Sequence, residues 1–489
     1  MTLSRRELLG MAGAALTELG CTLGARPEPR LLPSEIPLPK PFQVPLPRPA
    51  VLKPAATEPD IDCYELDARP AAATLLPGLT TPIWGYNGAF PGPTIEARRG
   101  RRVSVRLRNS LPLPIVPHLH GGRTPPESDG YPTDLLQPGH TREYVYPNEQ
   151  RAATLWYHDH RMDFTGAQVW RGLAGFYLLR DDEELRLPLP RGEKEIALAI
   201  CDRSFTKNGA LHYPSLDPAL LQPAGVEHAY MGGVLGDVIL VNGAPWPKLD
   251  VAATRYRFRI LNASNARRYE LALDPAPPGG HPFIQIGSDG GLLAAPLPHG
   301  TLLISPAERF DVVVDFSRWP VGSVITMKNR DADGAAGQIL QFHVTHQEKD
   351  ESAIPAVLST LPPADASAAT LTREFSFAYN RGLMSWTING KPFDAARMDA
   401  RPKLGDTEIW RLKSDFSHPL HLHLVHFQVL SHSGRPGPFD AGWKDTVALR
   451  AGETANILVK FEGYRGRYVV HCHNLEHEDM AMMANFEVI

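Results

Sequence analysis

The C-terminal end of the chain concentrates residue types that bind metal ions. The run from residue 471 to residue 482 contains His471, Cys472, His473, His477 and Met482. A thiolate, imidazoles and a weak axial thioether are the ligands of a blue copper site. The spacing therefore predicts a bound copper ion, with Cys472, His477 and Met482 as candidate ligands.

The tripeptide His471-Cys472-His473 has a further property if it lies on a strand. Successive side chains of a strand point to opposite faces, so His471 and His473 face one way and Cys472 faces the other. One tripeptide can therefore touch two metal centres on opposite sides of the strand. This arrangement predicts electron transfer between the two centres.

Three further histidine clusters lie upstream, and each contains a His-x-His pair. They are His118 and His120, His158 and His160, and His418, His421 and His423. A His-x-His pair on an extended segment places two imidazoles on one face, although a single pair is weak support for a metal site. The four clusters hold ten of the 19 histidines, and this concentration favours metal binding. The other nine, such as His140, His212 and His432, are interpreted as surface or hydrogen-bonded residues.

These motifs resemble those of the multicopper oxidases, and most closely those of spore-coat-type bacterial laccases and bilirubin oxidases. The matching stretches are His118-Leu119-His120-Gly121-Gly122 continuing to Ser128-Asp129-Gly130, Trp156-Tyr157-His158-Asp159-His160, Gly287-Ser288-Asp289-Gly290-Gly291, Gly442-Trp443-Lys444-Asp445-Thr446 and the C-terminal run. The resemblance extends from about residue 84 to residue 489. Every position at which the family has a copper ligand holds a ligand residue here.

The resemblance implies four copper ions and assigns ligands to them. The type 1 copper takes His418, Cys472, His477 and Met482, the type 2 copper takes His118 and His421, and the type 3 pair takes His120, His158, His160, His423, His471 and His473. Spacing alone supports part of this assignment, because His421 and His423 share one strand face while His418 precedes them across a proline. Met480 and Met483 are interpreted as packing residues.

Two acids close to the ligands are candidates for proton delivery. Reduction of dioxygen to water consumes protons, which carboxylates can supply by general acid catalysis. Asp129 follows the first His-x-His pair by nine residues, and Glu478 directly follows His477. Taken alone, each is more simply interpreted as a solvated or salt-bridged acid. The resemblance favours a place for both beside the copper ligands.

The activity that the resemblance implies is that of a laccase. A small aromatic reducing substrate (a phenol, an amine or a linear tetrapyrrole) docks near His477 and gives up one electron at a time. The electrons pass through Cys472 to His471 and His473, and dioxygen is reduced to two waters where the type 2 and type 3 ligands converge. In this interpretation Cys472, His477, Asp129 and Glu478 are the catalytic residues.

Three alternatives are weaker on the residues present. A cuprous oxidase for copper tolerance often has a methionine-rich insertion, whereas no methionine occurs between His423 and His471. A copper nitrite reductase has fewer domains and no trinuclear cluster, which the complete histidine set disfavours. A non-enzymatic structural or cell-division protein of the same fold has degenerate copper sites, unlike this chain. Copper stoichiometry separates this last alternative from an oxidase.

The elements that must position these residues repeat three times along the chain. An Asn-Gly dipeptide at residues 87–88, 242–243 and 389–390 is followed by an alternating strand pattern at 103–109, 256–262 and 408–412. Patterns typical of long helices are nearly absent. The sequence therefore predicts an all-β protein of three cupredoxin-like Greek-key β-sandwich domains. The His-x-His pairs occur only in the first and third units, so we expect the copper cluster at their interface and a spacer role for the second.

We expect the domain limits at composition changes and proline-rich stretches. They are a signal peptide (1–26), a proline-rich arm wrapped on the first domain (27–59), domain 1 (60–190), domain 2 (191–345), a linker (346–370) and domain 3 with the type 1 copper (371–489). The 47 prolines and 41 glycines are in keeping with many short strands joined by turns.

Charge and hydropathy exclude several classes of partner. The formal net charge of −4 over 489 residues disfavours nucleic acid and anionic membranes as electrostatic partners. No segment is long and apolar enough to span a bilayer. The sequence does not determine the oligomeric state, and a monomer is the simplest expectation.

The N-terminus predicts export. Arg5 and Arg6 precede a short apolar stretch, which is typical of a twin-arginine signal and predicts a periplasmic or secreted protein. Cys21 suggests a lipoprotein site only weakly, because Glu18 stands where such sites usually have leucine. An oxidising compartment would permit a disulfide between Cys63 and Cys201, and two free thiols are an equal expectation.

Overall fold

The structure, a computed structural model, describes residues 27–489. The predicted signal peptide at residues 1–26, including Arg5, Arg6 and Cys21, lies outside the described residues. Within residues 27–489 strands dominate, and the α-helices are short: α2 (Pro126–Asp129), α3 (Thr165–Arg171), α4 (Asp182–Arg186) and α5 (Leu475–Asp479). No helix in this part of the chain has the length and apolar composition needed to cross a membrane.

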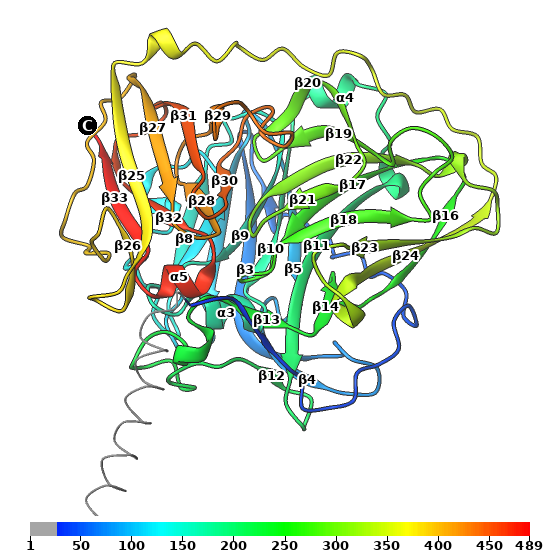
Figure 1. Cartoon of the computed structure of the whole chain (residues 1–489), viewed down its shortest axis with the longest axis horizontal. Helices are drawn as coiled ribbons and strands as arrows, with labels where there is room; N and C mark the ends of the chain where they lie inside the picture. The colour runs from blue at the N-terminus through cyan, green and yellow to red at the C-terminus, as the bar shows by residue number, and fades with distance from the viewer. Residues whose placement is uncertain (1–26) are drawn as a thin grey trace, which may run out of the picture.

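The strands form three pairs of sheets that follow one another along the chain (Figure 1). One sheet of the first pair contains β2 (Ala56–Thr57), β3 (Ile61–Ala73), β6 (Arg102–Asn109) and β8 (Thr141–Tyr146), with β4 (Thr81–Tyr86) on β3. The other contains β5 (Gly92–Arg98), β10 (Ala174–Arg180), β9 (Ala153–Asp159) and β7 (Pro117–His120). The third pair consists of β26 (Ser385–Ile388), β25 (Leu371–Asn380), β27 (Thr407–Ser414), β31 (Thr454–Lys460) and β29 (Phe427–His432) in one sheet, and β30 (Thr446–Leu449), β28 (His418–Leu422), β32 (Gly466–Cys472) and β33 (Met483–Val488) in the other.

The second pair of sheets is the largest. One sheet contains β15 (Ala244–Pro245), β14 (Val238–Val241), β11 (Glu195–Phe205), β17 (Arg255–Asn262), β22 (Arg309–Asp315), β19 (Phe283–Ser288) and β20 (Gly291–His299), with β12 (Leu211–His212) on β11. The other contains β16 (Lys248–Ala252), β24 (Gln338–His346), β23 (Val324–Asn329), β18 (Tyr269–Asp274) and β21 (Leu302–Ile304). The predicted fold class, all-β with three cupredoxin-like sandwiches, is confirmed.

The internal repeat is visible in the strand pairing. In each sandwich one parallel pair (β3 with β6, β11 with β17, β25 with β27) is extended by an antiparallel strand: β8, β22 and β31 respectively. Asn87, Asn242 and Asn389 each have φ between 53° and 54°, and the glycine that follows each also has positive φ. Each asparagine side chain accepts a backbone N–H from the first strand of its parallel pair. The Asn-Gly dipeptide therefore marks the same turn in all three units.

The proline-rich arm packs differently from our expectation. Its strand β1 (Arg30–Leu32) pairs with β13 (Val234–Gly236), and Phe42 and Leu46 donate backbone hydrogen bonds to Trp246 and Lys248, all in the second sandwich. Only the end of the arm reaches the first sandwich, where Leu52 pairs with Thr94. The expectation that the arm wraps on the first domain was therefore wrong for most of its length. Proline spacing predicts an extended conformation but carries no information on the neighbouring surface.

Residues 347–370 cross from the second sandwich to the third as a long connection, coloured yellow at the top of Figure 1. The connection is held on the second sandwich by a hydrogen bond from Leu358 N–H to the carbonyl of Ala294 and by an ion pair of Asp350 with Arg255. The first and second sandwiches precede this connection in the chain and the third follows it, in keeping with the domain limits that we propose.

Within residues 27–489, neither Cys63 nor Cys201 forms a disulfide. Cys63 on β3 is half-buried and Cys201 on β11 is buried, and both are free thiols.

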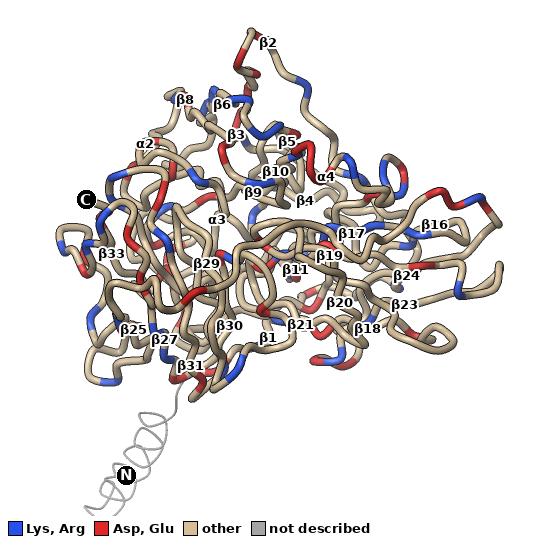
Figure 2. Tube along the Cα trace, turned by 90° about the horizontal axis from the view of Figure 1, so that it is seen from above, with Lys and Arg blue, Asp and Glu red and all other residues tan. Residues whose placement is uncertain are grey.

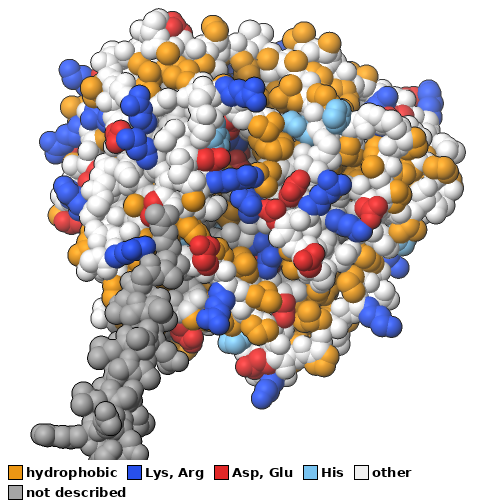
Figure 3. Space-filling model, viewed as in Figure 1, with side chains coloured by type: hydrophobic (Ala, Val, Ile, Leu, Met, Phe, Trp, Pro, Cys, Tyr) orange, Lys and Arg blue, Asp and Glu red, His pale blue; other side chains and the backbone are white. Residues whose placement is uncertain are grey.

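Acidic and basic residues are interspersed along the trace (Figure 2), and the face seen in Figure 3 mixes both signs of charge with hydrophobic side chains.

Candidate metal centre

Three of the predicted type 1 ligands meet inside the third sandwich. His418 begins β28, Cys472 ends β32 and His477 lies on α5. The Cys472 Sγ atom is 3.3 Å from His418 Nδ1 and 3.6 Å from His477 Nδ1, and these two nitrogens are 3.0 Å apart. All three side chains are fully buried. One thiol and two imidazoles thus converge on a single point, as a blue copper site requires.

Met482 is placed beside these ligands by backbone hydrogen bonds. Its carbonyl accepts from the Cys472 N–H at 3.1 Å, and its own N–H donates to the His477 carbonyl at 3.0 Å. Its side chain is fully buried, whereas Met480 is partly exposed and Met483 starts β33. Of the three methionines, Met482 is therefore the one whose backbone is hydrogen-bonded to both Cys472 and His477.

A second set of histidines gathers between the first and third sandwiches. Three groups have ligand atoms within 4.8 Å of one another: His118, His120 and His421; His120, His158 and His473; and His160, His423 and His471. His471 lies opposite His421 in the register of β28 and β32, and Cys472 lies opposite Leu420. His471 and His473 therefore reach this set while Cys472, between them, reaches the other.

The donor atoms of this set fit a metal centre. The Nε2 atoms of His118, His158 and His421, Nδ1 of His120 and both ring nitrogens of His473 are buried without a hydrogen-bond partner among residues 27–489. Each buried polar atom without a partner costs about 1–3 kcal/mol. Coordination removes this cost, and imidazole suits copper. The second nitrogens of His118, His158 and His421 are held by the backbone carbonyls of Asp129, Asp159 and Asp445.

The protonation state of these histidines also suits metal binding, because a ligand imidazole must be neutral. Burial lowers the pKa of His118, His120, His158, His423, His471 and His473 well below the usual range, and that of His160 to about 4. Burial raises the pKa of the Cys472 thiol, and a coordinated metal is the ordinary means of keeping such a thiol ionised.

Both predicted acids contact histidines that we predicted as ligands. The Asp129 Oδ2 atom accepts a hydrogen bond from His423 Nδ1 at 2.8 Å, and burial raises the pKa of Asp129 to about 8. The Glu478 carboxylate lies between two rings, with Oε1 3.3 Å from His160 Nδ1 and Oε2 3.0 Å from His471 Nδ1. Burial raises the pKa of Glu478 as well. The two acids flank the group formed by His160, His423 and His471.

The imidazole of His477 is covered, which the sequence did not indicate. It has no exposed surface, its Nε2 is 3.2 Å from the Gly232 carbonyl oxygen, and the Trp386 ring stacks on it with centroids 3.8 Å apart. A substrate that approaches His477 would therefore meet the chain at Gly232 before the imidazole itself. A tryptophan in a strand pattern is ordinarily read as core, so no sequence signal marked Trp386.

Sequence reasoning also gave no role to Asp445, although its Gly442–Thr446 motif was recognised. The Asp445 Oδ1 atom is 3.1 Å from His120 Nε2, the nitrogen that points away from the histidine cluster. The acid lies in a segment far from His120 in the sequence, so only the fold brings the two together.

Comparison with known proteins agrees with the geometry. Two profiles described as multicopper oxidase match residues 67–184 and 363–489. The laccase of Bacillus subtilis is 39% identical over 504 residues, covering 90% of this chain and 97% of that protein. The bilirubin oxidase of Albifimbria verrucaria is 36% identical over 450 residues, covering 86% and 76%. The crystal structure of a laccase from Pediococcus acidilactici superposes with a TM-score of 0.84 at 32% identity, covering 94% of this chain and 96% of that one. The chain therefore belongs to the multicopper oxidase family and is a copper-dependent oxidoreductase of laccase type.

Proposed function

We propose that this enzyme couples one-electron oxidation of small aromatic substrates (phenols, amines or bilirubin-like tetrapyrroles) to the four-electron reduction of dioxygen to water. The observation that carries the proposal is the tripeptide His471-Cys472-His473, whose cysteine lies in one ligand set and whose histidines lie in the other. Laccases and a bilirubin oxidase are among its relatives, which supports the substrate class.

We assign the ligands of four copper ions as the resemblance to the multicopper oxidases implies. His418, Cys472, His477 and Met482 hold type 1 copper, His118 and His421 hold type 2, and His120, His158, His160, His423, His471 and His473 hold the type 3 pair. The three histidine groups and the thiol-containing group support the separation of the type 1 site from the cluster of the other copper ions. Copper held by these residues would supply one-electron redox chemistry.

The protein residues then have distinct roles. The His477 imidazole faces the Gly232 carbonyl oxygen. We propose that the aromatic substrate docks on the chain that covers His477 at this point. One peptide bond joins Cys472 to His471 and another joins it to His473, so Cys472 connects the substrate side to the histidine cluster. Asp129 and Glu478 are placed to hold protons at His423, His160 and His471, and we propose that they deliver protons to oxygen there.

We further propose that the chain is exported to the periplasm or secreted through the twin-arginine pathway. The support is the Arg5-Arg6 pair followed by a short apolar stretch in the sequence.

Oxygen consumption with a panel of phenols, bilirubin and cuprous ion tests the reaction. The proposal expects four molecules of a one-electron aromatic donor to be oxidised per dioxygen, with no hydrogen peroxide released. Turnover of cuprous ion at a kcat/KM more than tenfold above every aromatic donor would instead favour the cuprous oxidase alternative. Stoichiometric peroxide would contradict reduction to water.

A further inference from the structure

A buried chain of charges joins the second sandwich to the histidine cluster, although the second sandwich contributes no predicted ligand. Arg309, at the start of β22, and Asp289, just after β19, lie in the second sandwich; Lys444 and Asp445 lie just before β30 in the third. The side chains of all four are at most 1% exposed. Burying so many charges is unfavourable unless each is paired, so their arrangement is specific.

Arg309 is the centre of this chain, and each of its five N–H donors has an acceptor. Nε donates to the Thr154 carbonyl on β9 at 2.9 Å, and Nη1 donates to the Ala307 carbonyl at 2.9 Å and to Asp445 Oδ1 at 2.7 Å. Nη2 donates to the other oxygen of Asp445 and to the Asp289 carbonyl. The guanidinium thus holds the Asp445 carboxylate at both oxygens and ties it to the first and second sandwiches.

Asp445 passes this constraint to two histidines. Its Oδ1 atom is 3.1 Å from His120 Nε2, and its backbone carbonyl accepts from His421 Nδ1 at 2.9 Å. The opposite nitrogens, Nδ1 of His120 and Nε2 of His421, are buried without a hydrogen-bond partner among the described residues. The contacts of Asp445 therefore leave the inward nitrogen of both rings free to bind metal.

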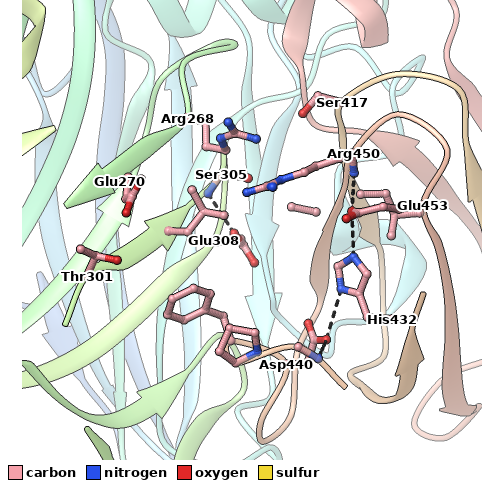
Figure 4. Close-up of a pocket in the computed structure, with 16 residues that line it drawn as sticks. Arg268, Glu270, Thr301, Ser305, Glu308, Ser417, His432, Asp440, Arg450 and Glu453 are labelled. Atoms are coloured by element: carbon pink, nitrogen blue, oxygen red, sulfur yellow. Dashed lines mark hydrogen bonds and ion pairs between the residues drawn. The ribbon is translucent and has the colours of Figure 1, made fainter. Parts of the chain in front are cut away.

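Asp289 and Lys444 form the end of this series of charges that lies away from the histidine cluster. The Asp289 Oδ2 atom accepts from the backbone N–H of Thr446 at 3.3 Å and lies 3.2 Å from Lys444 Nζ, which also lies 3.2 Å from Glu308 Oε1. Glu308 lines a cavity of about 430 Å³ between the second and third sandwiches (Figure 4). Each charged group of Arg309, Asp445, Asp289 and Lys444 thus has an oppositely charged partner within this series.

We propose that Arg309 and Asp289 of the second sandwich are positioning residues for copper: through Asp445 they fix the ring orientation and tautomer of His120 and His421. In this account the second sandwich is more than a spacer. The proposal also gives a role to the Gly287–Gly291 and Gly442–Thr446 motifs, which hold Asp289, Lys444 and Asp445. It rests on the proposed assignment of His421 to type 2 copper and His120 to the type 3 pair.

The test compares Arg309→Lys with Arg257→Lys. Lysine keeps the charge but has three donors and cannot hold both oxygens of Asp445. Arg257 is a matched control: it is also buried, pairs with Asp311 and Glu184, lies on the neighbouring strand β17 and touches no ligand histidine. The readouts are copper affinity by equilibrium dialysis, the type 2 signal in electron paramagnetic resonance and the blue absorption of the type 1 site.

For Arg309→Lys we expect copper affinity at the trinuclear site to fall by about 10–100-fold, with an altered or missing type 2 signal and an unchanged blue band. Arg257→Lys should keep the wild-type signal. Equal copper loss in both variants, or a wild-type affinity and type 2 signal in Arg309→Lys, would overturn the proposal. Wild-type protein that binds no copper would refute the proposed function itself, a distinct outcome.

If Arg309→Lys does not fold, the variant Asp445→Asn tests whether Asp445 fixes the tautomer of His120. Asparagine offers both an acceptor oxygen and an NH2 donor, so it can bond either tautomer of His120, and it loses the paired charge with Arg309. In copper-free protein, nitrogen NMR should show the Nε2-protonated tautomer of His120 in the wild type and a mixture of tautomers in Asp445→Asn. A single unchanged tautomer in the variant would contradict a positioning role.

Discussion

Met482 is held next to Cys472 and His477, which we propose as type 1 ligands, by two backbone hydrogen bonds, so its position does not depend on its thioether. The thioether tunes the copper by weak axial donation. Met482→Leu should therefore raise the type 1 reduction potential while the blue colour remains. Met480→Leu is the control, because Met480 is partly exposed and bonded through its carbonyl to Ser385. A redox titration in which only Met480→Leu shifts the potential would show that the axial ligand is misassigned.

Asp129 and Glu478 contact different histidines of one group, so their removal should affect the same step. Asp129→Asn and Glu478→Gln keep size and hydrogen bonding but cannot transfer a carboxyl proton. Because a positioned general acid is typically worth about 10²–10⁴-fold, we expect turnover to fall by more than tenfold in each variant. Copper content and anaerobic reduction of the type 1 site should stay normal. If copper is lost instead, the two acids support the ligands and protons arrive by another route.

Single ligand residues were predictable because their chemistry and their period are local. His471, Cys472 and His473 owe their division between two sites to strand alternation, which the sequence displays directly. Arg309, Asp445 and Trp386 were missed because each acts across segments more than 90 residues apart. No local pattern distinguishes a buried arginine that orients a ligand from one that pairs only with buried acids away from the histidines, as Arg257 does with Asp311 and Glu184.

His432, the last residue of strand β29, forms an ion pair with the loop that follows the strand and lies at the wall of the cavity in Figure 4. His432 lies 3.2 Å from Asp440 and 3.0 Å from Glu453, and its hydrogen bond to Asp440, with the negative charge of both acids, raises the pKa of His432 to about 9. A pKa raised on folding adds stability that is complete below the unfolded value of about 6.5 and is lost as pH rises through about 9.

His432→Gln should accordingly lower the free energy of unfolding by roughly 1–3 kcal/mol at pH 6 and by almost nothing at pH 10.5. The urea midpoints of the two proteins at both pH values give the measurement. His346→Gln serves as the control because that imidazole is 62% exposed. A midpoint difference that persists unchanged at pH 10.5 would mean that packing rather than charge holds the loop.

The strands at 103–109, 256–262 and 408–412 could be predicted because apolar and polar residues alternate along them, and they appear as β6, β17 and β27. On β17 the polar face is buried as well, so alternation did not reveal that Arg257 and Arg259 are covered. The Asn-Gly turns could be predicted because both residues tolerate positive φ. The course of the arm could not, since β1 pairs with β13 through backbone hydrogen bonds that any residues could make. Pairing of that kind leaves no mark in composition.

The three sandwiches together explain why the ligands are split between the ends of the chain. The first supplies four histidines and the third supplies six with Cys472, while the second holds the charges that reach Asp445. Residues 347–370 are long enough to carry the chain past the second sandwich, so the third can lie against the first (Figure 1). Helix α3 of the first sandwich and α5 of the third meet through Asp479, which accepts the N–H groups of Thr165 and Gly166.

Export is a property of the full chain and depends on residues outside the described range. We expect Arg5→Lys with Arg6→Lys to leave the precursor in the cytoplasm, because the paired arginines are the recognised part of the signal. Cell fractionation followed by immunoblotting measures this, and a variant with Arg26→Lys is the control. Normal secretion of the double variant would assign the Arg-Arg pair to chance.

The account depends most on two separate copper centres that share the tripeptide His471-Cys472-His473. Copper content and visible absorption of wild-type protein and Cys472→Ser test it most directly. The account predicts four copper ions and an intense blue band in the wild type, and three copper ions without that band in Cys472→Ser. A variant that keeps the blue band, or a wild type with a single copper ion, would contradict it.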